Sequence, residues 1–191
     1  AAGWYKGKMG FEGLEKRRNH YGENTALLAQ MVIRYEDGTE ELFVTDESWS
    51  GADAPVVFAE IYDGEIYDGA KEIKGWSEAG CTAGQWKPVR KLDYDFSVLT
   101  GQGSGKVSLM DEVKPKEIFE TPEGDLVIDF GQNMSALIQV TATGKKGDVI
   151  RLDCFEVLDS KGNVYLDNLR GAKESLQYTF GEDGTDRKSV V

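Results

Sequence analysis

The stretch that decides the fold is DLVIDFGQNMSALIQVTATGKKGDVIRLDCFEVL, residues 125–158. Three runs rich in Val, Ile, Leu and Thr, at 125–130, 136–143 and 148–158, are separated by short segments that contain Gly, Asn or Lys. Aliphatic and β-branched residues favour strands, and the separating segments have the composition of turns. The stretch therefore predicts three consecutive strands.

The same pattern continues in both directions along the chain. Residues 26–35 and 41–45 flank Asp37-Gly38, a strong hairpin signal, and residues 174–180 form a further strand candidate. Strand candidates recur about every 10 residues with turn signals between them, and no segment keeps a helical period. The predicted fold class is all-β, with two consecutive antiparallel β-sandwich or jelly-roll domains, both truncated.

A break between the two predicted domains falls at GQGSG, residues 101–105, because small polar residues leave the backbone unrestrained. The predicted domains are residues 1–100 and 106–191. Within the first, KPVRKLDYDFSVLT (87–100) predicts one long strand or two. A long hairpin loop is the alternative interpretation of residues 101–105.

Composition narrows the classes of partner. The 191 residues carry a net charge of −12, which repels phosphate backbones and anionic lipids. Nucleic acid and membrane surfaces are therefore excluded as expected partners, and a neutral ligand or a cation fits better. The two cysteines, Cys81 and Cys154, lack metal spacing and predict free thiols.

Catalytic patterns are missing from the sequence. The one histidine, His20, lies in a charged loop with no nucleophile pattern beside it, so no catalytic residue is assigned. The densest carboxylate cluster is Asp63, Glu65 and Asp68 within IYDGEIYDG. These residues fit two turn aspartates and a rim glutamate, and they also fit oxygen ligands of a hard cation or a domain interface.

An aromatic loop offers the strongest ligand-binding candidates. Trp4, Tyr5, Asn19 and Tyr21 lie in a stretch rich in glycine and charge. An aromatic face with a few fixed polar groups suits the apolar side of a sugar ring. The alternative is that Trp4 packs in a core or at a hinge.

Several short motifs, taken in order, resemble bacterial α-L-rhamnosidases. The first set resembles the N-terminal β-domain of that family, and it comprises GWYKG (3–7), Tyr21-Gly22, ALLAQ (26–30), YDGEIYD (62–68), GWS (75–77) and Trp86 with Pro88-Val89. The second set resembles the next β-domain, and it comprises IDFGQNM (128–134), Glu156-Val157-Leu158-Asp159, Asn168-Leu169-Arg170 and Tyr178. The resemblance covers nearly the whole chain.

The resemblance implies an accessory role. The family's catalytic carboxylates lie in a later (α/α) barrel, so the parent enzyme would hydrolyse terminal α-L-rhamnose by inversion while this chain alone is inactive. The motifs also place Gln132, Asn133, Asn168 and Arg170 as candidates for contact with that barrel or with a cation. Some family members bind rhamnose with calcium through such a β-domain, which makes calcium the one cofactor to consider. No metal ligand is assigned, and the compartment of a bacterial protein of this kind stays open.

Self-association of this chain is a further expectation. A truncated β-domain leaves strand edges unpaired, and unpaired edges recruit other strands. Sedimentation across a concentration series would show oligomers if this is right and a monomer throughout if it is wrong.

Overall fold

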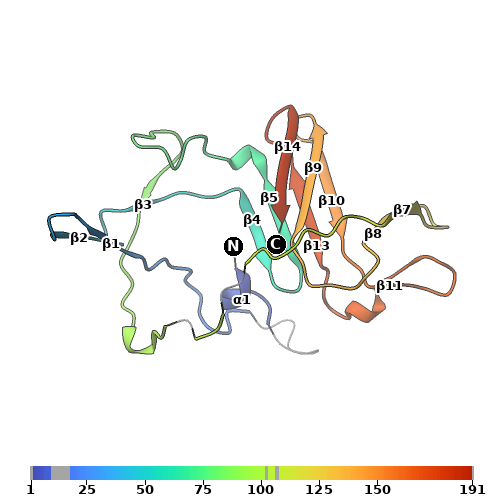
Figure 1. Cartoon of the computed structure of the whole chain (residues 1–191), viewed down its shortest axis with the longest axis horizontal. Coiled ribbons are helices and arrows are strands. Elements are labelled where there is room, and N and C mark those ends of the chain that lie inside the picture. Colours follow the sequence, from blue (N-terminus) through green and yellow to red (C-terminus); the bar gives the residue numbers. More distant parts are fainter. Residues whose placement is uncertain (1, 10–17, 102, 106–107, 191) are drawn as a thin grey trace.

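The computed structural model describes residues 2–9, 18–101, 103–105 and 108–190. Within these ranges the helices are the α-helix α1 (Gly3–Lys6) and the short 3-10 helices η1 (Gly69–Lys71), η2 (Phe96–Val98) and η3 (Asp167–Leu169) (Figure 1). The strands are β1 (Gln30–Arg34), β2 (Glu40–Val44), β3 (Ser50–Gly51), β4 (Val56–Glu60), β5 (Gly64–Asp68), β6 (Lys87–Pro88), β7 (Glu117–Glu120), β8 (Leu126–Asp129), β9 (Ile138–Gly144), β10 (Val149–Asp153), β11 (Val157–Leu158), β12 (Val164–Tyr165), β13 (Ser175–Thr179) and β14 (Gly184–Val190). The predicted all-β class is confirmed.

The largest sheet has four strands in the order β10-β13-β5-β4. Three features of its pairing matter: β10 with β13 is antiparallel, β4 with β5 is antiparallel, and β5 with β13 is parallel, with Tyr67 opposite Tyr178. The parallel pair departs from the antiparallel expectation. It also joins strands from both sides of residues 101–105 in one sheet, while the division into domains at that segment stays a prediction.

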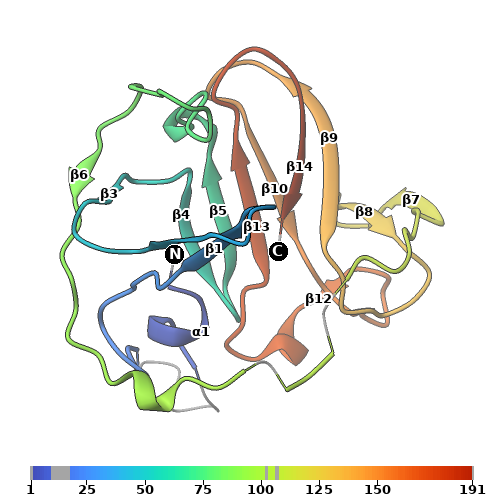
Figure 2. The same cartoon turned by 60° about the vertical axis from the view of Figure 1, so that its left-hand side comes forward.

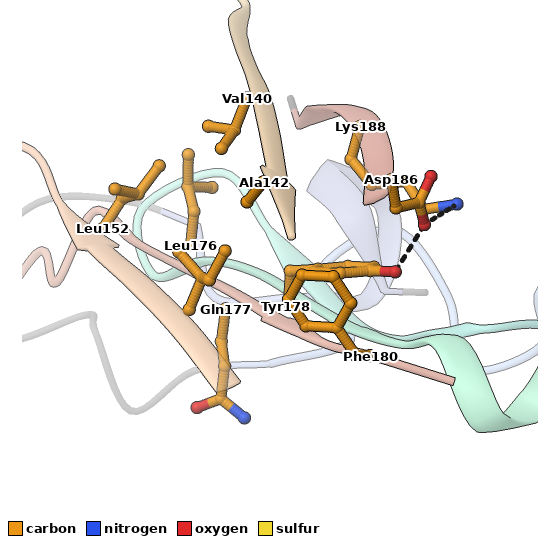
Figure 3. Close-up of a pocket in the computed structure, with 10 residues that line it drawn as sticks. Val140, Ala142, Leu152, Leu176, Gln177, Tyr178, Phe180, Asp186 and Lys188 are labelled. Carbon is orange, nitrogen blue, oxygen red and sulfur yellow. Dashed lines mark hydrogen bonds and ion pairs between the residues drawn. The ribbon is translucent and has the colours of Figure 1, made fainter. Parts of the chain in front are cut away.

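A second layer covers one face of this sheet. β9 and β14 pair antiparallel, with Ala142 opposite Asp186, and lie against β10 and β13 (Figures 1 and 2). Alternate residues of each strand point inward. A small, partly open pocket of about 20 Å³ lies between the layers, and its lining includes Val140, Ile150, Leu152, Leu176 and Phe180 (Figure 3). A space of this size holds one water at most, so the layers form a packed core.

Small sheets lie outside this core. β1 and β2 form the predicted hairpin with Met31 opposite Phe43, and β7 with β8, β3 with β6 and β11 with β12 form further two-stranded pairs. The β1–β2 hairpin projects away from the four-stranded sheet (Figure 1). A two-stranded hairpin alone is marginally stable in water, so this arrangement calls for packing partners.

The structure corrects three details of the sequence interpretation. Residues 87–100 form only the two-residue strand β6 and the turn of η2, so the prediction of one long strand or two is wrong. β14, in a segment that reads as an acidic tail, and β7 were not expected as strands. Cys81 and Cys154 are free, as predicted, and half-buried. Among the described residues, no helix has the length and apolarity needed to cross a membrane.

Candidate functional site

The aromatic candidates meet in space. The ring centroid of Trp4 lies 5.8 Å from that of Tyr5 and 5.2 Å from that of Tyr21, both edge-to-face, and His20 packs edge-on against Tyr21 at 4.9 Å. The side chains of Trp4 and Tyr21 are 57% and 53% exposed. We call Trp4, Tyr5, His20 and Tyr21 the aromatic cluster. The exposed rings of Trp4 and Tyr21 are the kind of aromatic surface that a sugar ring stacks on.

Backbone hydrogen bonds hold the two halves of the cluster together. The Tyr21 amide donates to the Tyr5 carbonyl at 3.3 Å, and the Asn19 amide donates to the Lys6 carbonyl at 3.0 Å. Asn19 has φ 58°, a left-handed conformation that asparagine tolerates well. Asn19 is exposed to solvent. The structure thus brings all four predicted ligand-binding residues into one neighbourhood.

A buried carboxylate anchors this segment to the four-stranded sheet. The Glu60 side chain, at the end of β4, is fully buried, accepts the Lys8 amide at 3.2 Å and pairs with Arg18. Gly7 allows the close approach, because a Cβ there would lie 3.1 Å from Cγ of Glu60. The position of the aromatic cluster therefore depends on Glu60, a residue that the sequence did not point to.

The three carboxylates of the 61–69 cluster are not brought together. Asp63 pairs with Lys8 at 2.9 Å, and Asp68 caps η1 by accepting the Ala70 amide at 3.1 Å. Glu65 is buried, and burial raises the pKa of its carboxyl. In the described part of the chain, no group of three or more His, Cys, Asp or Glu residues could hold a metal ion. These residues therefore do not fit a calcium site.

The remaining predicted candidates lie on two exposed segments. Gln132 and Asn133 follow β8, and Asn168 and Arg170 lie at η3. The Asn168 side-chain amide donates to Glu156 at 2.9 Å, and Arg170 ends η3 with φ 57°. Their exposure leaves them available for contact with another part of a larger protein, and that role stays a prediction.

A polar cluster that the sequence analysis missed joins β5, η1, β13 and β14. Lys188 Nζ lies 2.7 Å from Glu72 and 3.1 Å from Asp186, and it sits 4.9 Å from the ring centroid of Tyr67. The hydroxyl of Tyr178 donates to Asp186 at 2.5 Å (Figure 3). The hydroxyl of Tyr67 donates to Glu72, also at 2.5 Å. The two rings lie 5.6 Å apart. We call these five residues the tyrosine–lysine cluster.

Burial and the polar contacts within the tyrosine–lysine cluster shift the pKa values of its side chains. Burial and the hydrogen bond to Glu72 raise the pKa of Tyr67 to about 12, and burial and the bond to Asp186 raise the pKa of Tyr178. Burial alone would lower the pKa of Lys188, but its bonds to Glu72 and Asp186 outweigh that and raise it. The Tyr178 hydroxyl, as the main cause, lowers the pKa of Asp186.

The raised pKa values predict a loss of stability at alkaline pH. Between pH 10 and about 12 the folded chain keeps the Tyr67 proton that the unfolded chain releases, so unfolding becomes easier as the pH rises. Urea unfolding across this interval should show the free energy of unfolding falling, with a weaker fall in Tyr67→Phe. A flat profile, or one unchanged in Tyr67→Phe, would contradict the role assigned to this hydroxyl.

Two family models match the chain, and they divide it between them. The α-L-rhamnosidase N-terminal domain matches residues 1–111, and the bacterial α-L-rhamnosidase concanavalin-like domain matches residues 119–190. An α-L-rhamnosidase of Streptomyces avermitilis is 36% identical over 187 residues, which are 97% of this chain and 18% of that protein. One from an Alteromonas species is 30% identical over 186 residues, which are 96% of this chain and 20% of that protein.

Solved structures agree with the sequence matches. The native α-L-rhamnosidase of Aspergillus terreus superposes with a TM-score of 0.91 at 33% identity, covering 97% of this chain and 21% of that one. The Streptomyces avermitilis enzyme complexed with L-rhamnose gives 0.87 at 35% identity, covering 98% and 18%. The chain thus spans about a fifth of the length of these relatives. It belongs to the α-L-rhamnosidase family, in which it matches the N-terminal domain and the concanavalin-like domain.

Proposed function

We propose that this chain is a non-catalytic accessory part of an α-L-rhamnosidase, and that the parent enzyme hydrolyses terminal α-L-rhamnose from glycans or glycosides. In this proposal the chain supports a catalytic (α/α) barrel elsewhere in the parent chain. One observation carries the proposal: many large apolar side chains of this chain are exposed, and side chains of this kind are ordinarily buried against other protein surface.

The amount of exposed surface supports this role. The chain exposes 15346 Å², whereas a compact protein of its mass exposes about 9,000 Å². The β1–β2 hairpin contributes to this large exposed area. Met31 and Phe43 face one side of it and Val32 and Leu42 the other, and all four are more than 40% exposed.

A hairpin that is apolar on both faces needs cover on both faces. Exposed apolar side chains gathered in this way mark an interaction site. We call the exposed apolar residues of this region the hairpin surface, which comprises Leu27, Leu28, Met31, Val32, Tyr35, Leu42, Phe43 and Val44. The relatives are several times longer than this chain, so the remainder of a rhamnosidase chain, including its catalytic domain, is the occupant that fits.

The direct test is hydrolysis by the isolated chain. Purified protein should release no product from an aryl α-L-rhamnoside above the rate without protein, because no catalytic carboxylate pair is assigned to it. Turnover that rises in proportion to protein concentration, and that falls in a Glu65→Gln variant, would show instead that the chain carries its own active site.

A second candidate function rests on the aromatic cluster, which could stack on L-rhamnose and make the chain a carbohydrate-binding module. Calorimetric titration with L-rhamnose, with and without calcium, should then give a saturating heat that Trp4→Ala weakens by about tenfold or more. Trp76→Ala is the matched control, because Trp76 is 67% exposed and outside the cluster. No heat at millimolar sugar, or equal losses in both variants, would remove this candidate.

A further inference from the structure

The turn that follows η3, at the lower edge of the molecule in Figure 2, holds an arginine in a backbone conformation that suits glycine. Arg170 has φ 57° and ψ −107°, and the Ala172 amide donates to the Leu169 carbonyl at 3.0 Å. These features are those of a type II′ turn, whose first central position ordinarily belongs to glycine. The next residue, Gly171, has a φ outside the left-handed region, so the strained position carries the large side chain and the relaxed one does not.

Contacts from both family regions hold this turn in place. The Gly171 carbonyl accepts the Lys8 ammonium at 3.1 Å, and the Tyr62 carbonyl accepts the amides of Lys173 at 2.9 Å and Glu174 at 3.1 Å. Lys8 and Tyr62 belong to the region matched to the N-terminal domain, and the turn belongs to the concanavalin-like region. Strained residues persist where the surrounding structure determines their conformation, and they cluster at functional sites.

The Arg170 side chain makes no polar contact that would account for this strain within the described part of the chain. Arg170 is exposed, and its side chain forms no hydrogen bond or ion pair with any residue that the structure describes. The Glu156 carboxylate, which reaches η3, already accepts the Asn168 side-chain amide at 2.9 Å. Tyr165 and Leu166, a few residues before the turn, are 40% and 48% exposed. Arginine and aromatic side chains are enriched in protein interfaces.

We propose that Arg170 docks onto a carboxylate of another domain of the parent rhamnosidase. This inference rests on the proposed function and names one contact of it. A guanidinium presents its donors as a planar fork that matches a carboxylate with two hydrogen bonds, so a fixed backbone direction adds geometric selectivity. A phosphate fits the same fork, but the net charge of −12 repels polyanions. The relatives are several times longer than this chain, so the rest of such a chain is the source of the carboxylate.

Urea unfolding of the 191-residue chain tests whether the conformation of Arg170 is strained. Arg170→Gly should raise the folding equilibrium constant about threefold or more, because glycine adopts this conformation without a steric penalty. Glu174→Gly is the matched control, since Glu174 is also exposed and has φ 46°, and it should raise the constant by a similar factor. Arg170→Gln keeps the strain and should leave the constant unchanged.

A chimera in which this chain replaces its aligned segment in the Streptomyces avermitilis enzyme tests the docking contact. Arg170→Gly and Arg170→Gln should each lower the midpoint temperature of thermal inactivation by about 2 °C or more, because each leaves the carboxylate without its partner. Glu174→Gly should keep or raise that midpoint. Arg170→Gly would thus stabilise the isolated chain and destabilise the chimera, a reversal of sign that a purely internal role of Arg170 does not produce.

The outcomes separate this inference from the proposed function. An inactive chimera would contradict the proposed function and the inference with it. The docking role of Arg170 alone would be overturned by an active chimera whose midpoint is unchanged in both Arg170 variants or falls equally in Glu174→Gly. An isolated Arg170→Gly chain that is no more stable than the parent would also overturn it.

Discussion

Replacing Gly64 with alanine is expected to lower the free energy of unfolding by about 3–5 kcal/mol, the largest effect among the substitutions proposed. Gly64 opens β5 with φ +92°, and a Cβ there would lie 2.7 Å from the carbonyl carbon of Ser175 and 2.8 Å from its nitrogen. Those atoms are backbone of β13 and cannot swing aside. The substitution should therefore push β5 away from β13 and break the parallel pairing that unites the sheet.

Gly38→Ala is the matched control for this prediction. Gly38 lies in the β1–β2 turn with φ +84°, and a Cβ there would meet nothing within 4 Å. Alanine at this position pays only for the left-handed conformation, about 1–2 kcal/mol. Urea unfolding of both variants separates backbone strain from the clash. Equal losses in the two would show that the close contact between β5 and β13 does not contribute.

Glu60→Ala is expected to have the second largest effect, a loss of about 2–3 kcal/mol. It removes a fully buried carboxylate and leaves the Lys8 amide and Arg18 without their acceptor. The cost stays in this range because the Arg18 side chain is 49% exposed and can regain water. Urea unfolding gives the total, and amide exchange at residues 3–9 should accelerate as the aromatic cluster loses its anchor.

Glu40→Ala controls for the loss of an ion pair as such. Glu40 pairs with Arg34 at 2.6 Å, but both side chains are more than half exposed. Pairs of this kind contribute less than about 1 kcal/mol, so Glu40→Ala should unfold nearly as the parent does. A Glu60→Ala variant that also unfolds like the parent, with amide exchange unchanged at residues 3–9, would contradict the anchoring role of Glu60.

The β1–β2 hairpin was predicted from the sequence because its signal, Asp37-Gly38, is local. Asp37-Gly38 and Asp63-Gly64 each lie between runs of strand-forming residues, and each joins an antiparallel pair in the structure. The residues around Trp4 and Tyr21 were also found from composition alone, since aromatic side chains in a glycine-rich loop stand out. Their meeting depends on backbone hydrogen bonds between residues 5 and 21 that no pattern displays.

The elements that were missed depend on distant partners. β14 has the polar sequence GTDRKSV, and it is a strand because it pairs along its whole length with β9. Its inward positions Asp186 and Lys188 are stabilised by Tyr178 and Glu72, which lie elsewhere in the chain. The one signal in the sequence was that Asp186 and Lys188 occupy alternate positions, with Thr185 and Arg187 at the positions beside them. Without knowledge of the partner strand, such a run of polar and charged residues cannot be told from a solvated tail. Periodicity likewise says nothing about which strand β5 pairs with.

The exposure of the hairpin surface and the greater length of the relatives both support the proposal that these β-sheets pack against other domains of a larger rhamnosidase. The tyrosine–lysine cluster then has a structural role, since it fixes β14 over the sheet that both family regions share. Residues Gln132, Asn133, Asn168 and Arg170, exposed on their loops, are the polar positions proposed for contacts at the edge of that packing.

The most direct test of the account is a chimeric enzyme. This chain would replace its aligned segment in the Streptomyces avermitilis α-L-rhamnosidase, and hydrolysis of an aryl α-L-rhamnoside would be compared with that of an enzyme lacking the segment. The account predicts that the chimera is active and thermally stable, that the deleted enzyme is not, and that Leu42→Ser with Phe43→Ser in the chimera weakens both properties. A deleted enzyme as active and as stable as the parent would contradict the supporting role of this chain.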